Sequence, residues 1–431
     1  MTQITRRRIN VVSASRVVLC REDGELGAQV VKERDSSQRA RTPSTVLALI
    51  LTLALGLAAC SGSSGSGASG DGAGGTSTSS VPAAEVTFTP AAGSNGVKPR
   101  ESVGIAVGNG KIVSVALSNE QGEKVKGKLA EDAKSWKVTE PLGYGTTYTW
   151  SGTAVSDEGK RTPIKGSFTT VQPQSIVHGQ FNVGDNRTYG VAMPIALSFD
   201  QPIKNKAAVE KALSVQTSTD VKGSWAWLDG GTSVHWRPKE YWPAHTKVHV
   251  EAMLYGVNMG GGAYGEADIT VDFNIGEQQA IKGNTQTHRL KLFRGGELIA
   301  NYPVSYGASS DPRRVTRSGT HVVMAEHETF SMSNAQFGYE NVEVPWAIRI
   351  SNNGEFIHGY EKTIPVQGKQ NVSHGCINMA PQNAHAVVQF AQIGDPVEIT
   401  GSSKQLGPSD GAYYDWTISW SQWQTLSALN G

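Results

Sequence analysis

The chain has 431 residues, a formal net charge of +1 at pH 7 and 49 glycines. Its length exceeds what one ordinary domain needs and predicts roughly two to four domains. The near-neutral charge, without long blocks of like charge, excludes proteins that bind nucleic acid through a basic surface. Short runs rich in Val, Thr, Trp and Tyr, separated by glycine-containing turns, predict a mostly β protein.

Residues 1–59 are predicted to be a signal peptide region. Residues 46–59 form one apolar run, which is shorter than the about 20 residues of a membrane-spanning helix and is preceded by basic residues. The run ends in Leu-Ala-Ala-Cys at Cys60, which resembles a bacterial lipobox. The resemblance implies cleavage before Cys60, lipidation of its thiol, and an extracytoplasmic lipoprotein anchored to the outer face of the cell membrane. A plain cleaved signal peptide is the alternative.

Two further features belong to this region. Residues 1–29 are long for the segment that precedes such an apolar run, and a start at Val30 or Val31 would give an ordinary signal peptide. Residues 60–82 contain the lipidation cysteine, followed by a stretch made almost entirely of Gly, Ser, Ala and Thr. Such a stretch cannot bury a core and is predicted to be a flexible linker.

Residues 83–173 and 174–276 are predicted to be two similar β-modules. Each contains short strand-like runs separated by turns, including a long one from Tyr189 to Phe199 in the second module. Trp136 and Trp236 each precede another strand-like run, and each module closes on an aromatic strand. This echo predicts a duplicated immunoglobulin-like sandwich.

The second module is also rich in aromatic and imidazole side chains. Stacking of sugar rings on indoles would make it a carbohydrate-binding module, whereas alternating tryptophans also fill a sandwich core or a joint between domains. We favour packing. The residues concerned are Trp225, Trp227, Trp236 and Trp242. The histidines at positions 235, 245 and 249 are scattered on strands and are predicted to be packing or surface residues.

Residues 277–400 are predicted to be a mostly β domain with one helix. A hairpin is expected from Thr287 to Val304, and Asn352-Asn353-Gly354 is expected to turn the chain into a strand that ends at His358. The helix is expected from Pro381 to Gln392, because proline favours the first helical position and Gly394 follows the end. A Trp-rich C-terminal extension occupies residues 401–431.

Cys376 is the only cysteine after Cys60. A thiol becomes a useful nucleophile when a neighbouring base takes its proton, and two candidate bases lie nearby in the sequence, His358 and His374. An inert buried thiol is the alternative. No metal site or other cofactor is implied, because one cysteine with two histidines lacks the usual closed set of zinc ligands.

His358, followed after residues 359–372 by Ser373-His374-Gly375-Cys376-Ile377-Asn378, resembles the signature of L,D-transpeptidases of the YkuD type. The order of lipobox, linker, two β-modules, catalytic domain and Trp-rich tail also resembles the actinobacterial members, over roughly residues 83–425. The resemblance implies two immunoglobulin-like β-sandwich modules followed by a YkuD-like, mainly β catalytic domain with one prominent helix.

The resemblance also implies a reaction on the stem peptides of peptidoglycan. Cys376 would attack the carbonyl of the meso-diaminopimelyl residue of a tetrapeptide donor, release D-Ala, and pass the acyl group from a thioester to the diaminopimelate amine of an acceptor stem. The product is a 3→3 cross-link, and carbapenems are expected to acylate the same thiol.

Other functions were weighed against this one. Water as the acceptor would make the protein an L,D-carboxypeptidase, and a decayed site would make it a non-catalytic wall-binding scaffold. A sortase is disfavoured, because neither its usual Thr-Leu-x-Thr-Cys strand nor its partner arginine is found near Cys376. Beyond the stem peptides and a membrane reached through the lipid anchor, no partner is implied, and nucleic acid is excluded.

The resemblance assigns roles to single residues. Cys376 is the nucleophile, His358 the base and later the acid, and the carbonyl of Gly359 orients the imidazole. The amides of Gly375 and Cys376 would form an oxyanion hole. The other motif residues are assigned to the loop: Ser373 and Asn378 hold it by hydrogen bonds, and His374 shapes it or carries a proton, with shaping favoured.

The region between Met324 and Trp346 is implied to be a lid over the site. Tyr339 matches a lid tyrosine whose hydroxyl could assist the oxyanion, and Phe330 stands where some relatives have tyrosine. Met324 and Trp346 either line the pocket or belong to the ordinary core.

Overall fold

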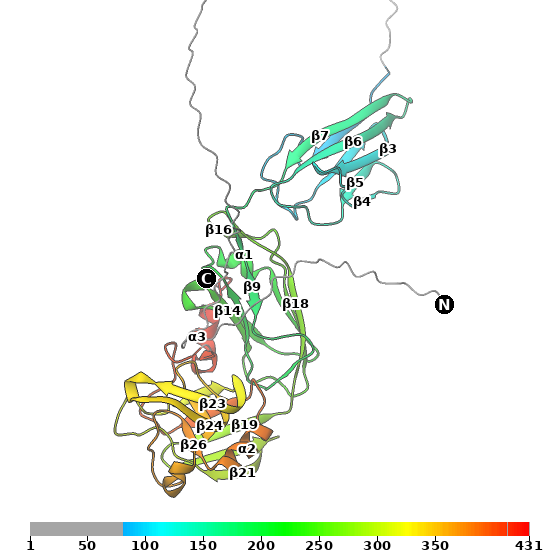
Figure 1. Ribbon diagram of the computed structural model, residues 1–431. Coiled ribbons are helices and arrows are strands. Elements are labelled where there is room, and N and C mark those ends of the chain that lie inside the picture. The colour runs from blue at the N-terminus through cyan, green and yellow to red at the C-terminus, as the bar shows by residue number, and fades with distance from the viewer. Residues whose placement is uncertain (1–80, 412, 431) are drawn as a thin grey trace, which may run out of the picture. The chain divides into compact units, whose positions relative to one another are not determined.

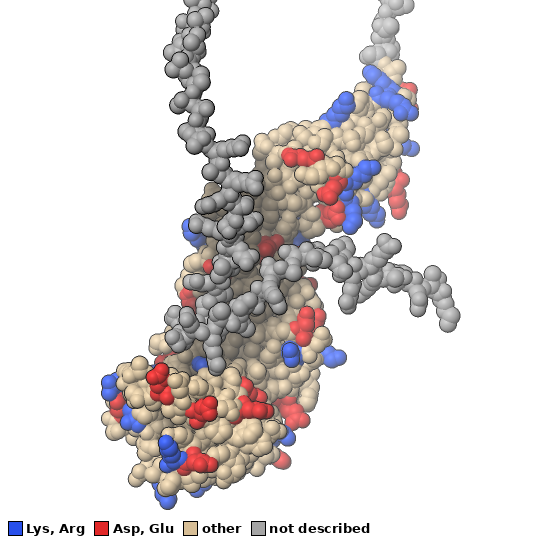
Figure 2. Space-filling view, viewed as in Figure 1, with Lys and Arg blue, Asp and Glu red and all other residues tan. Residues whose placement is uncertain are grey.

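The computed structural model describes residues 81–411 and 413–430 (Figure 1). The predicted signal peptide region, Cys60 and the Gly/Ser-rich stretch up to Ser80 lie outside the described residues, and the predictions made for them stay predictions. In the described part of the chain, no helix combines the length and the apolar character needed to cross a membrane. Figure 2 shows basic and acidic side chains interspersed over the visible face, in keeping with a net charge near zero.

The first β-module contains two sheets around one apolar core. The alternation of buried and exposed residues in its strands places side chains such as Trp150 and Phe168 between the sheets, both 2% exposed. One sheet has the order β1 (Glu85–Thr89), β2 (Gly104–Gly108), β5 (Ser135–Val138), β4 (Gly127–Leu129), and the other has the order β3 (Gly110–Ser118), β6 (Thr147–Ser156), β7 (Arg161–Thr169).

The second module is built around a larger core of its own. Its sheets have the orders β10 (Thr188–Tyr189), β18 (Ile269–Ile275), β15 (Lys247–Ala252), β12 (Leu213–Thr217); β13 (Gly223–Leu228), β14 (Ser233–Pro238), β11 (Ile195–Phe199), β9 (Gly179–Phe181); and β16 (Asn258–Gly260), β17 (Ala263–Gly265), β8 (Ser175–Val177). A short helix, α1 (Lys206–Glu210), follows β11.

One strand prediction in this module is wrong. The expected strand from Tyr189 to Phe199 is two strands in different sheets, β10 and β11. Between them Gly190 donates its N–H to the carbonyl of Ile393 in the catalytic domain at 2.8 Å, so this stretch bonds to another part of the chain instead of continuing a sheet. Pro194, which has no N–H to donate, precedes the new strand.

The echo between the modules is visible in their packing. A β-carbon added at Gly127 would lie 1.9 Å from Cζ2 of Trp136, and one added at Gly223 would lie 1.9 Å from Cζ2 of Trp236. In each module, therefore, an indole lies directly over a glycine of the neighbouring strand, where no side chain fits. This repeated contact supports the interpretation of a duplicated module.

The tryptophans of the second module are buried. Trp225, Trp227, Trp236 and Trp242 are 8%, 6%, 6% and 2% exposed. Their indole faces are therefore not available to stack on a sugar, and the packing interpretation is confirmed.

The catalytic domain consists of two sheets and one helix, as the sequence predicts. The first sheet has the order β21 (Glu297–Pro303), β20 (Arg289–Arg294), β19 (Gln279–Asn284), β27 (Pro396–Thr400), β22 (Gly319–Val322). The second has the order β23 (Ala325–Asn334), β24 (Tyr339–Arg349), β25 (Phe356–Gly359), β26 (Ile377–Met379). The helix α2 (Pro381–Phe390) packs on β24 and β25 (Figure 1) and ends two residues earlier than predicted, because Ala391 is extended. The predicted lid is the long hairpin β23–β24.

The C-terminal segment packs on the second module. It contains the single-turn helix η4 (Asp415–Thr417) and the helix α3 (Trp420–Thr425), which contacts β13. Trp423 is 0% exposed and donates its indole N–H to the carbonyl of Ser224 at 2.9 Å. The guanidinium of Arg237, itself 2% exposed, lies 4.7 Å from the ring of Trp423. The Trp-rich tail is thus an integral part of the folded structure.

We expect Trp423→Ala to lower the free energy of unfolding by about 3–5 kcal/mol, the usual cost of deleting a buried aromatic side chain. Denaturant unfolding followed by circular dichroism measures the change. Ser421→Ala, an exposed position in the same helix, is the control and should stay within about 0.5 kcal/mol of wild type. Equal stability of the two variants would contradict this account of the tail.

Candidate active site

His358 and Cys376 come from two neighbouring segments of one sheet. Strands β25 and β26 pair in parallel, with His358 opposite Asn378. Cys376 lies one residue before β26 and borders the start of β25, since its sulfur lies 3.6 Å from the carbonyl oxygen of Gly354 and its side chain clusters with Phe356. Both are buried, at 4% and 8% exposure. The structure thus places the two residues that the motif singles out on neighbouring segments of one sheet.

The imidazole of His358 is oriented by a backbone carbonyl. Its Nδ1 donates to the carbonyl oxygen of Gly359 at 3.0 Å, which leaves Nε2 as the unprotonated nitrogen of the neutral ring. Burial lowers the pKa of His358 to about 4, and the bond to Gly359 opposes that shift only in part. At neutral pH the ring is therefore uncharged and able to accept a proton.

Gly359 is also required by packing. A β-carbon at this position would lie 3.0 Å from Cγ of Pro345 and 3.0 Å from Cα of Pro381, the first residue of α2. The absence of a side chain therefore lets the end of β25 fit closely between these two prolines. In this protein the contribution of Gly359 to the site comes from its carbonyl oxygen.

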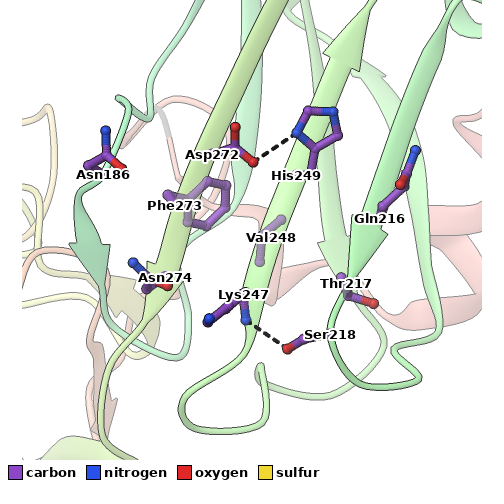
Figure 3. A pocket seen from close by; sticks show the side chains of 10 residues that line it. All are labelled: Asn186, Gln216, Thr217, Ser218, Lys247, Val248, His249, Asp272, Phe273 and Asn274. Carbon is purple, nitrogen blue, oxygen red and sulfur yellow. Dashed lines mark hydrogen bonds and ion pairs between the residues drawn. The ribbon is translucent and has the colours of Figure 1, made fainter. Parts of the chain in front are cut away.

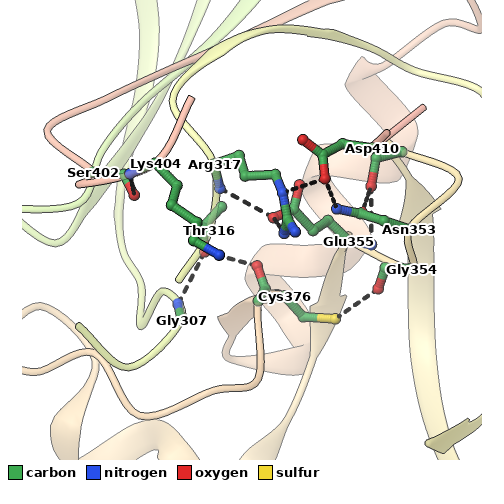
Figure 4. Close-up of polar contacts among 12 residues, drawn as sticks. Gly307, Thr316, Arg317, Asn353, Gly354, Glu355, Cys376, Ser402, Lys404 and Asp410 are labelled. Atoms are coloured by element: carbon green, nitrogen blue, oxygen red, sulfur yellow. Dashed lines mark hydrogen bonds and ion pairs between the residues drawn. The ribbon is translucent and has the colours of Figure 1, made fainter. Parts of the chain in front are cut away.

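The Cys376 thiol is neutral and bonded away from the base. Burial raises its pKa to about 12, and a hydrogen bond from the Phe356 backbone opposes the shift. Its sulfur donates to the carbonyl oxygen of Gly354 at 3.6 Å (Figure 4). No hydrogen bond between this thiol and His358 occurs among the described residues. Transfer of the proton to His358 therefore requires the thiol to turn away from Gly354.

The loop that carries the nucleophile is held by hydroxyl groups. Ser373 Oγ donates to the carbonyl of Cys376 at 2.5 Å and accepts the N–H of Gly375 at 3.2 Å. Thr316 Oγ1 donates to the carbonyl of Gly375 at 2.7 Å (Figure 4). Gly375 has φ +122°, which residues with a side chain rarely adopt. Ser373 thus makes the bonds expected of a loop-holding residue.

These bonds correct one prediction. The amide of Gly375 was expected to contribute to the oxyanion hole, but its N–H already donates to Ser373. An amide that is bonded within its own loop cannot also receive the oxyanion without rearrangement. The donors that remain from the prediction are the amide of Cys376 and the hydroxyl of Tyr339.

Asn378 also differs from its predicted role. Its backbone pairs with Ser305, through bonds of 2.8 and 3.0 Å, but its buried side-chain oxygen has no hydrogen-bond partner among the described residues. The expectation that this side chain holds the loop is therefore wrong. Its strand register places the amide on the same face as His358 instead.

The side chain of His374 packs against the lid. Its exposed ring is 4.8 Å from the ring of Phe337 and 5.5 Å from the ring of Tyr339, measured between centroids. Burial, with the charge of Arg314, lowers the pKa of His374. No bond to Cys376 or His358 is found for it within the described structure. The loop-shaping role is therefore the one that the geometry favours.

Two of the lid residues belong to the surroundings of the thiol. Cys376 forms a small apolar cluster with Phe356 and its neighbours, and Phe330 packs against that cluster, with its ring 4.7 Å from the ring of Phe356. Tyr339, at the start of β24, is half-buried, and burial together with the nearby Cys376 raises the pKa of its hydroxyl. Tyr339 therefore lies near enough to Cys376 for the two groups to affect each other's charge.

The other two lid residues, Trp346 and Met324, lie outside the surroundings of the thiol. Trp346 packs against the core of the catalytic domain, with its ring 4.2 Å from the ring of His385 on α2, so its predicted pocket-lining role is wrong and the core alternative holds. Its φ of +55° marks an irregularity in β24 that turns the side chain to this side. Met324 lies between β22 and β23 and bonds through its backbone N–H to Arg349, outside the cluster around the thiol.

Several residues around Cys376 have no place in the sequence prediction. They are Gly307, Thr316, Arg317, Glu355 and Asp410, drawn with the thiol in Figure 4. The predicted turn at residues 352–354 was the one available signal, because it places the residues just before β25 near the site. Nothing in the spacing of Arg317 or Asp410 indicates that they meet there.

Two hollows lie outside the reacting pair. One, of about 320 Å³, adjoins the nucleophile loop and is lined in part by Gly307, Thr316 and Asn371. The other, of about 520 Å³, is a polar groove over β12, β15 and β18, where His249 bonds to Asp272 at 2.8 Å (Figure 3). All residues that line this groove belong to the second β-module, so it is a surface separate from the candidate active site.

Comparisons with known proteins identify relatives of this chain. Residues 278–399 match the L,D-transpeptidase catalytic domain (YkuD), and residues 94–258 match a bacterial Ig domain. L,D-transpeptidase 5 of Mycobacterium tuberculosis is 46% identical over 351 residues, which cover 81% of this chain and 78% of that protein. L,D-transpeptidase 2 of the same species is 31% identical, with coverages of 80% and 85%.

Solved structures are also similar in part. The structure of the L,D-transpeptidase LdtMt1 in complex with imipenem covers 51% of this chain and 97% of its own, at 28% identity and a TM-score of 0.44. An L,D-transpeptidase from Mycobacterium smegmatis covers 52% of this chain and 99% of its own, at 26% identity and a TM-score of 0.42. With the motif, the catalytic-domain match and relatives aligned over most of their length, the chain belongs to the L,D-transpeptidase family.

Proposed function

We propose that this protein is a peptidoglycan L,D-transpeptidase that forms 3→3 cross-links through a thioester on Cys376. The observation that carries the proposal is the state of His358: it is neutral, its Nδ1 is bonded to the Gly359 carbonyl, and its strand pairs with β26, which begins directly after Cys376. A thiol beside such a base is equipped for acyl transfer.

The first half of the reaction makes the thioester. The thiol leaves Gly354, and its proton passes to Nε2 of His358 as the sulfur adds to the carbonyl carbon of the meso-diaminopimelyl residue. The tetrahedral intermediate then collapses. The bond to the nitrogen of the terminal D-Ala breaks, that nitrogen takes the proton from His358, and D-Ala departs.

The second half uses the same base. The side-chain amine of an acceptor stem adds to the thioester carbonyl, and His358 takes a proton from it. The carbon–sulfur bond breaks, the sulfur recovers the proton, and the stems are joined by an amide. With water in place of the amine, the same steps would release a tripeptide.

The pKa values of His358 and Cys376 indicate at which point of the reaction charge develops on the reacting groups. With His358 at about 4 and Cys376 at about 12, the neutral pair is stable and a separated ion pair is not. The proton therefore moves as the sulfur–carbon bond forms, when negative charge shifts to the substrate oxygen. The Cys376 amide and the Tyr339 hydroxyl are the donors proposed for that oxygen, and one such donor lowers the barrier by roughly 3–4 kcal/mol.

Membership in the family extends the proposal to β-lactams and to the cell envelope. LdtMt1 is described in complex with imipenem, and we propose that carbapenems acylate Cys376 of this protein by the same attack on a carbonyl. We also propose that Cys60 carries a lipid that anchors the protein outside the cytoplasmic membrane, on the basis of the apolar run at residues 46–59 and the Leu-Ala-Ala-Cys that ends it.

We expect Cys376→Ala to abolish cross-linking and acylation by imipenem, since Cys376 carries the only thiol in the part of the chain that the structure describes. Incubation with a tetrapeptide-stem muropeptide, followed by mass spectrometry, should give a dimer and free D-Ala with wild type and neither with the variant. Imipenem should add its mass to wild type alone. Tripeptide without dimer would overturn transpeptidation in favour of a carboxypeptidase, and a dimer formed by the variant would overturn the thiol mechanism.

The pH dependence of kcat/KM tests the state of the base. The neutral form of His358 is the active one, and burial lowers its pKa from 6.5 to about 4, so activity should be lost only as the pH falls through about 4. We expect a nearly constant kcat/KM between roughly pH 5.5 and pH 8, whereas a histidine with the ordinary pKa would lose activity below about 6.5. An acid limb near 6.5 would contradict the buried neutral base.

Tyr339→Phe tests the hydroxyl on the lid. If that hydroxyl donates to the oxyanion, its loss should lower kcat roughly 10- to 100-fold with little change in KM, because the bond forms only in the transition state. Tyr302→Phe, on β21, is the matched control and should keep the wild-type kcat. A change confined to KM would assign Tyr339 to substrate binding instead.

A further inference from the structure

A buried carboxylate lies directly behind the nucleophile loop. Glu355 is 2% exposed and follows Gly354, whose carbonyl accepts the thiol proton of Cys376. A β-carbon added at Gly375 would lie 3.6 Å from Cγ of Glu355, so the side chain is in contact distance of the loop. Glu355 therefore adjoins the nucleophile in two ways. Its backbone follows the carbonyl that accepts the thiol proton, and its side chain lies against the loop at Gly375.

Arg317 holds the carboxylate in place. Oε1 of Glu355 accepts the backbone N–H of Arg317 at 3.0 Å and its Nη1–H at 3.1 Å (Figure 4). Fully buried His321 lies on the other side, with Nδ1 at 3.7 Å from Oε2 of Glu355 and Nε2 at 3.0 Å from the Arg317 carbonyl. A buried charge is stable only when it is paired and hydrogen-bonded. Here Oε1 is bonded twice to Arg317, whereas Oε2 lies near His321 and has no hydrogen-bond partner among the described residues.

The C-terminal segment bonds to Arg317 and to the turn before β25. Asp410 Oδ1 lies 2.6 Å from Nε of Arg317 and accepts the side-chain N–H of Asn353 at 3.2 Å. The carbonyl of Asp410 accepts the backbone N–H of Asn353 at 3.0 Å. Asp410 lies beyond residue 399, where the match to the catalytic domain ends. The turn 353–355 is thus bonded on one side to Arg317 and on the other to the C-terminal segment.

We propose that Glu355, Arg317 and Asp410 act as positioning residues for Cys376, by fixing the turn 353–355 whose Gly354 carbonyl holds the thiol. The inference rests on the proposed role of Cys376 as the nucleophile. It makes the C-terminal segment part of the construction of the active site, and it explains why four charged or ionisable groups are kept behind the thiol where apolar packing would cost less.

The charges around the thiol support this assignment. Besides burial, which raises the pKa of Cys376 most, the charge of Glu355 raises it and that of Arg349 lowers it. Burial raises the pKa of Glu355, and His321 and Arg317 oppose that shift. Removing Glu355 therefore takes away both a charge that disfavours the thiolate and the support of the carbonyl that holds the thiol proton.

Alkylation of Cys376 by iodoacetamide tests the proposal without any peptidoglycan substrate. The full chain is treated between pH 6 and pH 10, and the rate is read by mass spectrometry on the peptide that contains Cys376. Glu355→Ala should be alkylated about tenfold faster than wild type at pH 8, because the loss of the carboxylate favours the thiolate and frees the thiol from the Gly354 carbonyl. Asp410→Asn, which weakens only the link to the C-terminal segment, should be alkylated about threefold faster.

A conservative variant and a control variant separate a positioning role of Glu355 from a general loss of structure. Glu355→Gln keeps an oxygen for both bonds from Arg317, so its turnover should stay closer to wild type than that of Glu355→Ala, whose loss should appear in kcat and not in KM. Glu361→Gln, an exposed carboxylate of the same domain, is the matched control and should change neither rate. Thermal melting of each variant checks that the fold is retained, and Asp410→Asn serves as the test if Glu355→Ala does not fold.

The outcomes distinguish the two proposals. If folded Glu355→Ala and Asp410→Asn are alkylated at the wild-type rate across the pH range, the positioning role is overturned, whatever the enzyme does to peptidoglycan. If the alkylation rates change as expected but wild type forms no cross-linked dimer, the positioning role stands and the proposed function fails.

Discussion

The hydrogen bond from His358 to the Gly359 carbonyl is the constraint on which the site depends. An imidazole usually needs a carboxylate to fix its tautomer, and a carboxylate brings a charge that must itself be paired. Here the backbone of the same strand supplies the acceptor, so the base is oriented at 3.0 Å without any added charge. This allows the ring to be buried and neutral, and burial in turn keeps the thiol protonated until substrate arrives.

The use of the Gly359 carbonyl to orient His358 requires close packing around this glycine. The carbonyl of Gly359 can be used because β25 fits closely between Pro345 and the first turn of α2, where a β-carbon would have to displace its neighbours. The parallel pairing of β25 with β26 then determines where the nucleophile can lie, since Asn378 is opposite His358 and Cys376 is two residues earlier. The sheet register, the proline-flanked glycine and the helix α2 therefore act together to fix the position of His358 relative to the strand that follows Cys376.

Sequence reasoning reached what local patterns encode. The alternation of apolar residues and the turn residues predicted the β architecture, and Pro381 predicted the start of α2. The resemblance to the YkuD motif named His358 and Cys376 as the reacting pair, which stays a prediction. Sequence reasoning failed where contacts between residues far apart in the sequence determine the partner or the orientation of a side chain. The amide of Gly375 is taken by Ser373, the Asn378 side chain lies on the His358 face, and an irregular residue in β24 directs Trp346 to the core. Arg317, Glu355 and Asp410 meet only in the folded chain, so no spacing could indicate them.

The charged residues behind the loop show a different physical solution from the one used for His358. The base avoids charge, whereas the turn that holds the thiol is fixed by paired charges on Glu355, Arg317 and Asp410. A planar guanidinium can bond two carboxylates at defined angles, which apolar contacts cannot do. Because Asp410 follows the last strand of the catalytic domain, the position of the nucleophile depends on a segment whose tryptophans pack on the second β-module. The stability of that packing and the geometry of the thiol are therefore linked through Arg317 and through the bonds from Asn353 to Asp410.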